Sequence, residues 1–149
     1  MIREARTEDA PESAAIWNHA IRETTITFNP MEKSDDEVAS LTAKQCLVWV
    51  EDNVVLGFAR YFPFRGGEGY RFTVEHTIML QADGHGKGGG RALMMALCDH
   101  ARASGMRSMF AGCSAENPGA VGFHAKLGFQ EVATLPEVGF KFGRWIDLV

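Results

Sequence analysis

The sequence predicts one α/β domain over residues 1–149, with a central sheet of mixed strand directions. Residues 70–80 alternate side chains between two faces, which predicts a long central strand. Two apolar runs, 46–50 and 54–62, are joined across a short polar turn, which is typical of a hairpin. Five glycines within residues 84–90 then lead into a helical segment at 91–104. These signals together favour a layered α/β fold.

Capping residues mark where the other helices begin. Thr7 is placed to cap a first helix, and Ser34 with Glu37 has the spacing of a capping box. Asn117 followed by Pro118 marks the start of a later helix. In chain order the signals predict a strand at 1–5, a helix after Thr7, a loop at 24–31, a helix from Ser34 to about residue 44, the hairpin, a loop at 64–69, the strand at 70–80, the helix at 91–104, a strand at 107–113, a helix from Asn117 to Gly128, and strands at 129–135 and 140–149.

Composition and charge exclude several classes of protein. Lys and Arg total 15 against 19 Asp and Glu, so the basic surplus of a nucleic-acid binder is missing. Apolar runs are only a few residues long and the N-terminus is charged, so we expect neither membrane insertion nor export. The three cysteines are far apart among apolar residues, and the histidines form no metal-ligand pairs. We therefore expect a cytoplasmic protein without a metal site.

The glycine cluster before the helix at 91–104 predicts a phosphate site. Its backbone N–H groups can converge on one point at the positive end of the helix, and Lys87 and Arg91 add positive charge. Two nucleotide motifs fail on context. The dinucleotide fingerprint that begins at Gly84 lacks its acidic partner, because the strand at 107–113 has no carboxylate. A P-loop requires Ser or Thr after the lysine, and Lys87 is followed by Gly88.

The same loop resembles the acetyl-CoA signature of the Gcn5-related N-acetyltransferase (GNAT) family. The signature Gln/Arg-x-x-Gly-x-Gly/Ala reads here from His85 to Gly90, with His85 in place of Gln or Arg. The family's helix that starts with Asn and ends in Leu-Gly-Phe recurs from Asn117 to Phe129. Over nearly the whole chain the sequence is similar to the phosphinothricin and methionine sulfoximine/sulfone N-acetyltransferases. Members of that subfamily usually continue beyond the position that corresponds to Val149 of this sequence. The segments that carry this second resemblance are Trp17-Asn18, Thr24-Thr25, residues 70–77 and residues 139–145.

The resemblance implies a GNAT fold, with helices on both faces of a mixed sheet and a splayed strand pair that binds acetyl-CoA. It implies transfer of an acetyl group from acetyl-CoA to a small-molecule amine, without a metal, by a homodimer. The backbone of Ile78, Met79 and Leu80 would pair with the pantetheine arm as an added strand. The pyrophosphate would lie on Gly86, Lys87, Gly88, Gly89, Gly90 and Arg91, and Asn117 would hydrogen-bond the cofactor's arm.

Two residues are candidates for proton transfer. Glu75 is the preferred base, because it lies in the strand just before the expected thioester site. A regular strand turns His76 to the opposite face, so one of the two should be buried structure, unless a bulge turns both inward. His124 lies seven residues after Asn117, where many family members place the acid that protonates the thiolate. A hydrogen-bonded core histidine is an equally good interpretation of His124.

The amine substrate is expected to contact a second glycine-rich loop. Arg65, Gly66 and Gly67 form this loop, and Arg65 can grip a substrate carboxylate through two hydrogen bonds. Arg71 and Arg144 are less favoured alternatives for that role. Further substrate contacts are expected from Glu75, His76 and Thr77 on the strand, with Phe28, Phe64 and Trp17 as walls of the pocket or as core residues.

Two other functions fit the same motifs. A protein N-terminal or lysine acetyltransferase would need an open groove in place of a closed pocket with a carboxylate clamp, and the Arg65 loop favours the clamp. A non-catalytic acetyl-CoA-binding module would keep the glycine loop but release no thiol with any amine.

Overall fold

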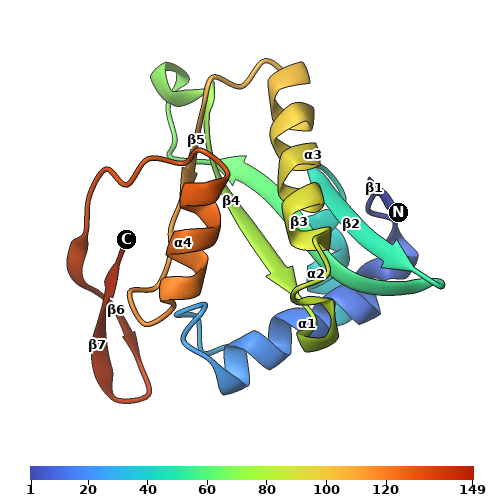
Figure 1. Ribbon diagram of the computed structural model, residues 1–149, viewed down its shortest axis with the longest axis horizontal. Helices are drawn as coiled ribbons and strands as arrows, with labels where there is room; N and C mark the ends of the chain where they lie inside the picture. The colour runs from blue at the N-terminus through green and yellow to red at the C-terminus, as the bar shows by residue number, and fades with distance from the viewer. The chain divides into compact units, whose positions relative to one another are not determined.

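A computed structural model describes all residues from Met1 to Val149. The element order predicted from the sequence is confirmed. It is β1 (Ile2–Glu4), α1 (Ala10–Glu23), α2 (Asp35–Thr42), β2 (Cys46–Glu51), β3 (Val54–Pro63), β4 (Thr73–Leu80), α3 (Gly89–Ala103), β5 (Ser108–Ala111), α4 (Pro118–Lys126), β6 (Leu135–Lys141) and β7 (Arg144–Leu148), with short 3₁₀ turns at Thr7–Asp9, Glu68–Tyr70 and Ala82–Gly84 (Figure 1).

The chain forms two compact units. The first contains Met1–Ile16 and Lys33–Phe110, and the second contains Trp17–Glu32 and Ala111–Val149. Helix α1 passes from one unit to the other. None of the helices has the length and apolar composition needed to cross a membrane.

The first unit is built on a five-stranded sheet in the order β1-β2-β3-β4-β5. Strands β1 to β4 pair antiparallel with their neighbours. The β2–β3 hairpin turns at Asp52 and Asn53, whose φ angles of 49° and 63° suit a tight hairpin turn. Helix α3 connects β4 to β5, the long crossover that neighbouring parallel strands require.

Two consecutive residues of β3 show that helices cover both faces of this sheet. Arg60 donates from Nε to the carbonyl of Leu41 in α2 at 3.0 Å. Tyr61, the next residue, places its hydroxyl 3.0 Å from Nδ1 of His100 in α3. Successive strand residues point to opposite faces, so α2 and α3 lie on opposite sides of the sheet. The expected helices on both faces are therefore confirmed.

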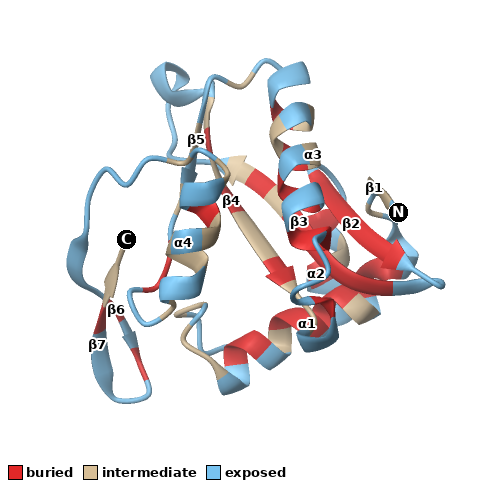
Figure 2. Cartoon of the chain, in the orientation of Figure 1, coloured by how far each residue is buried: buried red, intermediate tan, exposed pale blue.

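The core of the first unit lies between α3 and the central strands. Leu93, Met94 and Leu97 of α3 are completely buried, as are Val48 and Phe58 of β2 and β3. Figure 2 shows this as buried residues along β2 and β3 and on the inner side of α3. Each such side chain contributes about 1.5–3 kcal/mol through burial. This packing holds the start of α3, where the glycine loop ends.

The second unit contains α4 and the β6–β7 hairpin with the end of α1 and the segment after it. Asn117 caps α4 as predicted, because its side chain accepts from the N–H of Ala120 at 3.3 Å. The backbones of Cys113 and Val149 exchange two hydrogen bonds of 2.8 Å. In the hairpin, Gly139 pairs with Ile146 and Phe140 with Trp145.

Several element boundaries differ from the sequence prediction. The predicted last strand at 140–149 is divided by a turn at Phe142 and Gly143, so that β6 ends at Lys141 and β7 begins at Arg144. Arg6, not Thr7, occupies the first capping position, because Asp9 accepts from the Arg6 N–H and closes a 3₁₀ turn. Residues 70–72 are not strand, since a turn at Gly67 leads into a 3₁₀ turn instead. Helix α3 begins at Gly89 instead of residue 91. Residues 129–134 are not strand either, because the partner strand β7 ends at Leu148, opposite Leu135.

Candidate active site

Strand β4 turns the two candidate bases to opposite faces of the sheet. Its register with β3 is regular and places His76 across from Tyr61, and Glu75 across from Phe62. Directly opposed residues share a face. His76 therefore lies on the face that α3 covers, and Glu75 lies on the face that α2 covers. The expected separation of Glu75 and His76 is confirmed.

Glu75 is partly withdrawn from solvent. Its side chain is half-buried, and burial raises the pKa of its carboxyl above the ordinary value. A carboxylate with a raised pKa accepts a proton more readily at neutral pH. Thr77 lies on the same face two residues later and is also half-buried. His76 is more completely buried, at 7% exposure.

The end of β4 presents backbone groups to either side. Its pairing with β3 extends through Ile78 and Met79 to Leu80, which lies opposite Gly57. In an antiparallel ladder, alternate residues direct their N–H and C=O away from the paired strand. At least one of Ile78, Met79 and Leu80 therefore presents both groups to the β5 side. This geometry suits the pairing expected with an extended pantetheine arm.

The glycine loop forms a cradle of backbone N–H groups. Gly86 and Gly88 have φ angles of 79° and 78°, which strain any other residue. The first hydrogen bond of α3 runs from the Ala92 N–H to the Gly88 carbonyl, so the N–H groups of residues 89–91 have no acceptor within the helix. Lys87 and Arg91 are exposed beside them. A diphosphate fits this combination of N–H donors and positive charge.

Trp49 leaves no space for a side chain at Gly89 and little space for one at Gly84. A Cβ on Gly89 would lie 2.3 Å from the indole, and a Cβ on Gly84 would lie 3.0 Å from it. Trp49 is 3% exposed and its Nε1 donates to Glu51 at 3.3 Å. Contact with the indole thus fixes the position of the first residue of α3. Sequence reasoning missed Trp49, because nothing near it in the chain marks the contact.

The loop that contains Arg65 lies on the surface. The Arg65 guanidinium stacks on the Tyr70 ring at 4.9 Å, and Gly67 has a φ of 103°. Gly66 has open space around it. Phe64 stacks on the Phe110 ring with centroids 4.8 Å apart. The two alternatives to Arg65 have carboxylate partners: Glu68 for Arg71, and Glu116 for Arg144.

His124 is a buried side chain of α4. Its Nδ1 lies 2.7 Å from the Ala120 carbonyl and 3.5 Å from the Cys113 sulfur. The rings of Phe123 and Phe129 meet its imidazole edge-on. Burial lowers the pKa of His124, although the hydrogen bond to Ala120 opposes the shift. A neutral imidazole with its proton on Nδ1 matches the core interpretation better than the acid interpretation.

The sequence-predicted residues are distributed over the two units. Glu75, the end of β4, the glycine loop and the Arg65 loop belong to the first unit, and Asn117 and His124 belong to the second. Of the possible pocket walls, Trp17 is buried, and Phe28 packs against Gly139. The roles assigned to these residues stay predictions. Sequence reasoning gave no role to Lys141, although the segment 139–145 that contains it was part of the resemblance.

A family model and several relatives identify the chain's class. The model described as the acetyltransferase (GNAT) family matches residues 6–129. The chain belongs to the acetyltransferase (GNAT) family. The L-amino acid N-acyltransferase MnaT of Escherichia coli K12 is 39% identical to this acetyltransferase, over 99% of this chain and 89% of the relative. The L-methionine sulfoximine/L-methionine sulfone acetyltransferase of Salmonella typhimurium LT2 is 38% identical, over 99% of this chain and 90% of the relative.

The resemblance to the phosphinothricin and methionine sulfoximine acetyltransferases is confirmed. A phosphinothricin N-acetyltransferase from Alcaligenes faecalis is 34% identical over 99% of this chain and 79% of its own length. The GNAT fold is confirmed as well. The structure of the acetyltransferase yncA from Salmonella typhimurium with its cofactor acetyl-CoA has a TM-score of 0.95 and 36% identity, covering 99% of this chain and 89% of the other.

Proposed function

We propose that this acetyltransferase moves the acetyl group of acetyl-CoA to the α-amine of a small amino acid or analogue. Methionine sulfoximine, methionine sulfone and phosphinothricin are the preferred class, since relatives of this chain carry those names. The observation that carries the proposal is the arrangement along β4 and α3. A half-buried Glu75 precedes the backbone groups of residues 78–80, and the N–H cradle of residues 86–91 follows them.

Acetyl-CoA supplies the activated thioester in this proposal, and the chain supplies binding and proton transfer. The N–H groups at the start of α3, with Lys87 and Arg91, would hold the pyrophosphate. Glu75 would take the proton from the substrate ammonium, directly or through a water, so that a neutral amine attacks. The raised pKa of the Glu75 carboxyl lies closer to the pKa of the substrate ammonium, which makes this proton transfer easier. A backbone N–H among residues 78–80 would stabilise the developing oxyanion.

His124 remains the candidate acid, but its role has weaker support than that of Glu75 as the base. To protonate the departing thiolate it must carry a proton on Nε2 while Nδ1 stays with the Ala120 carbonyl. The lowered pKa of its imidazole opposes this doubly protonated form. We therefore assign His124 first to packing, beside Cys113 and Phe129, and the acid role second. Asn117 keeps its proposed contact to the cofactor through its side-chain Nδ2, since Oδ1 caps α4.

Arg65 is the residue we propose for the substrate carboxylate. Its guanidinium rests on the Tyr70 ring, which leaves its edge of N–H donors available to a carboxylate. Arg144 is already held by Glu116 through two hydrogen bonds of 2.9 and 2.6 Å. Arg71 lies 3.6 Å from a Glu68 carboxylate oxygen. Gly66 and Gly67 give the loop backbone the conformational freedom to adapt to the substrate.

We also propose that the enzyme is a homodimer in the cytoplasm. The outer face of the β6–β7 hairpin supports the dimer, because it exposes four large apolar side chains: Val138, Phe140, Phe142 and Trp145. The Phe140 and Trp145 rings lie 4.8 Å apart on this face. An exposed apolar patch of this kind is typical of an interaction surface.

A panel of amines tests the proposed function. Each amine is incubated with acetyl-CoA and the enzyme, and free thiol is measured. Thiol release with L-methionine sulfone, L-methionine sulfoximine or phosphinothricin is the expected result. Release only with peptides would favour the protein acetyltransferase. Acetyl-CoA that raises the Tm without thiol release from any amine would favour the non-catalytic module.

A further inference from the structure

Two phenylalanines of the first unit stand on either side of Glu75, one on each neighbouring strand. The first is Phe62 of β3, which pairs directly with Glu75 in the antiparallel ladder. Directly opposed side chains share one face of the sheet, with their Cβ atoms about 4.5–5.5 Å apart. Phe62 is half-buried, as Glu75 is. An aromatic side chain is therefore the direct neighbour of the carboxyl on the β3 side.

The second phenylalanine is Phe110 of β5. The Ser108 N–H, at the start of this strand, donates to the Phe72 carbonyl at 3.2 Å, one residue before β4 begins. Strands β4 and β5 then run side by side in the same direction, and each advances about 3.3 Å per residue. Phe110 therefore lies beside residues 74–75 of β4.

The Phe64 ring shows that Phe110 lies on the same face as Glu75. The Phe64 N–H donates to the Thr73 carbonyl at 3.2 Å, which extends the β3–β4 ladder by one pair. Side chains alternate along a strand, so Phe64 shares the face of Phe62 and Glu75. The Phe64 and Phe110 rings are stacked with their centroids 4.8 Å apart, so Phe110 lies on that face as well. We call Phe62, Phe64 and Phe110 the aromatic frame.

Contacts with Arg60 hold the β3 side of the aromatic frame in place. The Arg60 guanidinium lies 4.7 Å from the centroid of the Phe62 ring. The Nε of Arg60 donates at 3.0 Å to the Leu41 carbonyl in the last turn of α2, where the helix dipole is negative. Arg60 thus connects the ring to the helix and fixes the Phe62 side chain beside Glu75.

The β5 side of the aromatic frame is open to solvent. Phe64 is 40% exposed and Phe110 is 39% exposed, although the two rings are stacked on each other. An ammonium group fits this surface, because the Glu75 carboxylate and the faces of the rings both attract its charge. The carbon next to the nitrogen gains apolar contact with the rings. An anionic group, in contrast, would be repelled by Glu75.

We propose that Phe62 and Phe110 bind the acceptor amine: their rings flank the substrate ammonium and its α-carbon at the Glu75 carboxylate. Phe64 does not touch the amine in this account and positions the Phe110 ring. This inference rests on the proposed function. It names the residues that recognise the ammonium before Glu75 takes its proton, and all of them belong to the first unit.

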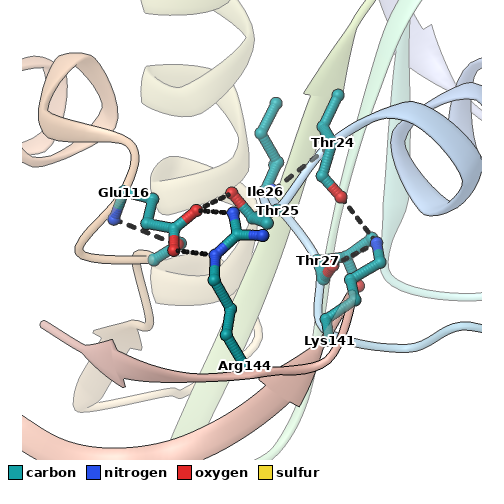
Figure 3. A network of polar contacts seen from close by, with 8 residues as sticks. Thr24, Thr25, Ile26, Thr27, Glu116, Lys141 and Arg144 are labelled. Carbon is teal, nitrogen blue, oxygen red and sulfur yellow. Dashed lines mark hydrogen bonds and ion pairs between the residues drawn. The ribbon is translucent and has the colours of Figure 1, made fainter.

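The position of Arg65 favours an α-amino acid as the amine. Arg65 directly follows Phe64 in the chain, so its guanidinium adjoins the aromatic frame. The alternative, Arg144, is already bound to the Glu116 carboxylate, as Figure 3 shows. An α-amino acid presents its ammonium to the frame and its carboxylate to Arg65. A simple alkylamine would make only the first of these contacts.

The test is a Phe110→Ala variant assayed with L-methionine sulfone and acetyl-CoA. We expect the KM for L-methionine sulfone to rise about three- to thirtyfold, the range that corresponds to the loss of one cation–π contact. The KM for acetyl-CoA should stay within about twofold of the parent value. Phe72→Ala is the matched control, because Phe72 is also an exposed ring of the first unit but stacks under Arg71, outside the frame. Both KM values should be unchanged in this control.

Phe64→Ala provides a second variant, which keeps the Phe110 ring but removes the ring that positions it. The KM for L-methionine sulfone should rise by a smaller factor, about two- to fivefold, with the KM for acetyl-CoA unchanged. This variant decides the question if Phe110→Ala does not fold. Equal rises in both KM values would overturn the inference, as would a lower Tm with both KM values unchanged. Either outcome leaves the proposed function intact, whereas a parent enzyme that releases no thiol with any amine overturns the proposed function itself.

Discussion

The contact between Gly89 and Trp49 makes the sharpest test of the structure. Gly89→Ala adds one methyl group 2.3–2.4 Å from three indole atoms, where carbon atoms normally stay about 3.5–4.0 Å apart. Trp49 has no room to retreat, since it is buried and also meets Gly84. Such overpacking typically costs about 1–3 kcal/mol. For a chain of this length, that lowers the Tm by roughly 2–12 °C.

A double-mutant cycle identifies the cause of this loss. Trp49→Phe removes the ring that the methyl group meets, so Gly89→Ala should cost much less in the Trp49→Phe background. We expect a coupling free energy of about 0.5–3 kcal/mol in the direction of rescue. The assay is thermal or urea unfolding of the four proteins, with acetyl-CoA affinity measured in parallel, because α3 begins at Gly89.

Gly122→Ala is the control for the cycle. Gly122 lies in α4 with open space around it, so the same substitution should stabilise the protein by about 0.4–1 kcal/mol. Equal losses from Gly89→Ala in both backgrounds would refute the assignment of Trp49. Gly89→Ala with parental stability and acetyl-CoA affinity would refute the close packing itself.

Three further predictions concern the proposed site and the dimer. Glu75→Gln should lower kcat/KM by about 10²–10⁴-fold and abolish the fall of kcat/KM at acidic pH; a pH–rate profile that keeps this acidic limb would count against Glu75 as the base. Arg65→Ala should raise the KM for the amine and lower kcat/KM roughly ten- to a hundredfold. Amidating the substrate carboxylate should add little to that loss, and additive losses would exclude the pairing. Phe140→Glu should convert a dimer into a monomer in sedimentation experiments, and a parent protein that sediments as a monomer contradicts the proposed dimer.

Local signals predicted most of the fold because they act between neighbours in the chain. The Ser34–Glu37 capping box and the Asn117 cap form as expected, since their partners are three residues away. Strand boundaries were less predictable, because the length of the partner strand decides where a strand begins and ends. Residues 129–134 carry a strand-like pattern, but β7 ends at Leu148 and offers them nothing to pair with.

The site was predictable to the extent that its chemistry is local. The alternation of β4 gives the opposite faces of Glu75 and His76, and positive φ angles explain Gly86 and Gly88. Gly84 and Gly89 were assigned to the same phosphate loop. The Trp49 indole, far earlier in the chain, also leaves little or no space for a side chain at these two positions. Lys141 lies 117 residues from Thr24, so no spacing rule connects them. Only tertiary structure brings such pairs together.

Glu75 and Lys141 each oppose folding at neutral pH, because each carries a partly buried charge. Burial raises the pKa of Glu75 and lowers the pKa of Lys141, so both shifts favour the neutral form. For Glu75, the folded pKa exceeds the unfolded pKa, and stability is lost as the pH rises through the folded value. For Lys141, the folded pKa is below the unfolded pKa, so the folded state is penalised at every pH below it and recovers only under alkaline conditions. At neutral pH each shift therefore opposes folding. A neutral side chain would remove that penalty at either position, but it would also remove the proposed proton acceptor on β4 and the only ammonium that holds the carbonyls of Thr24 and Thr27.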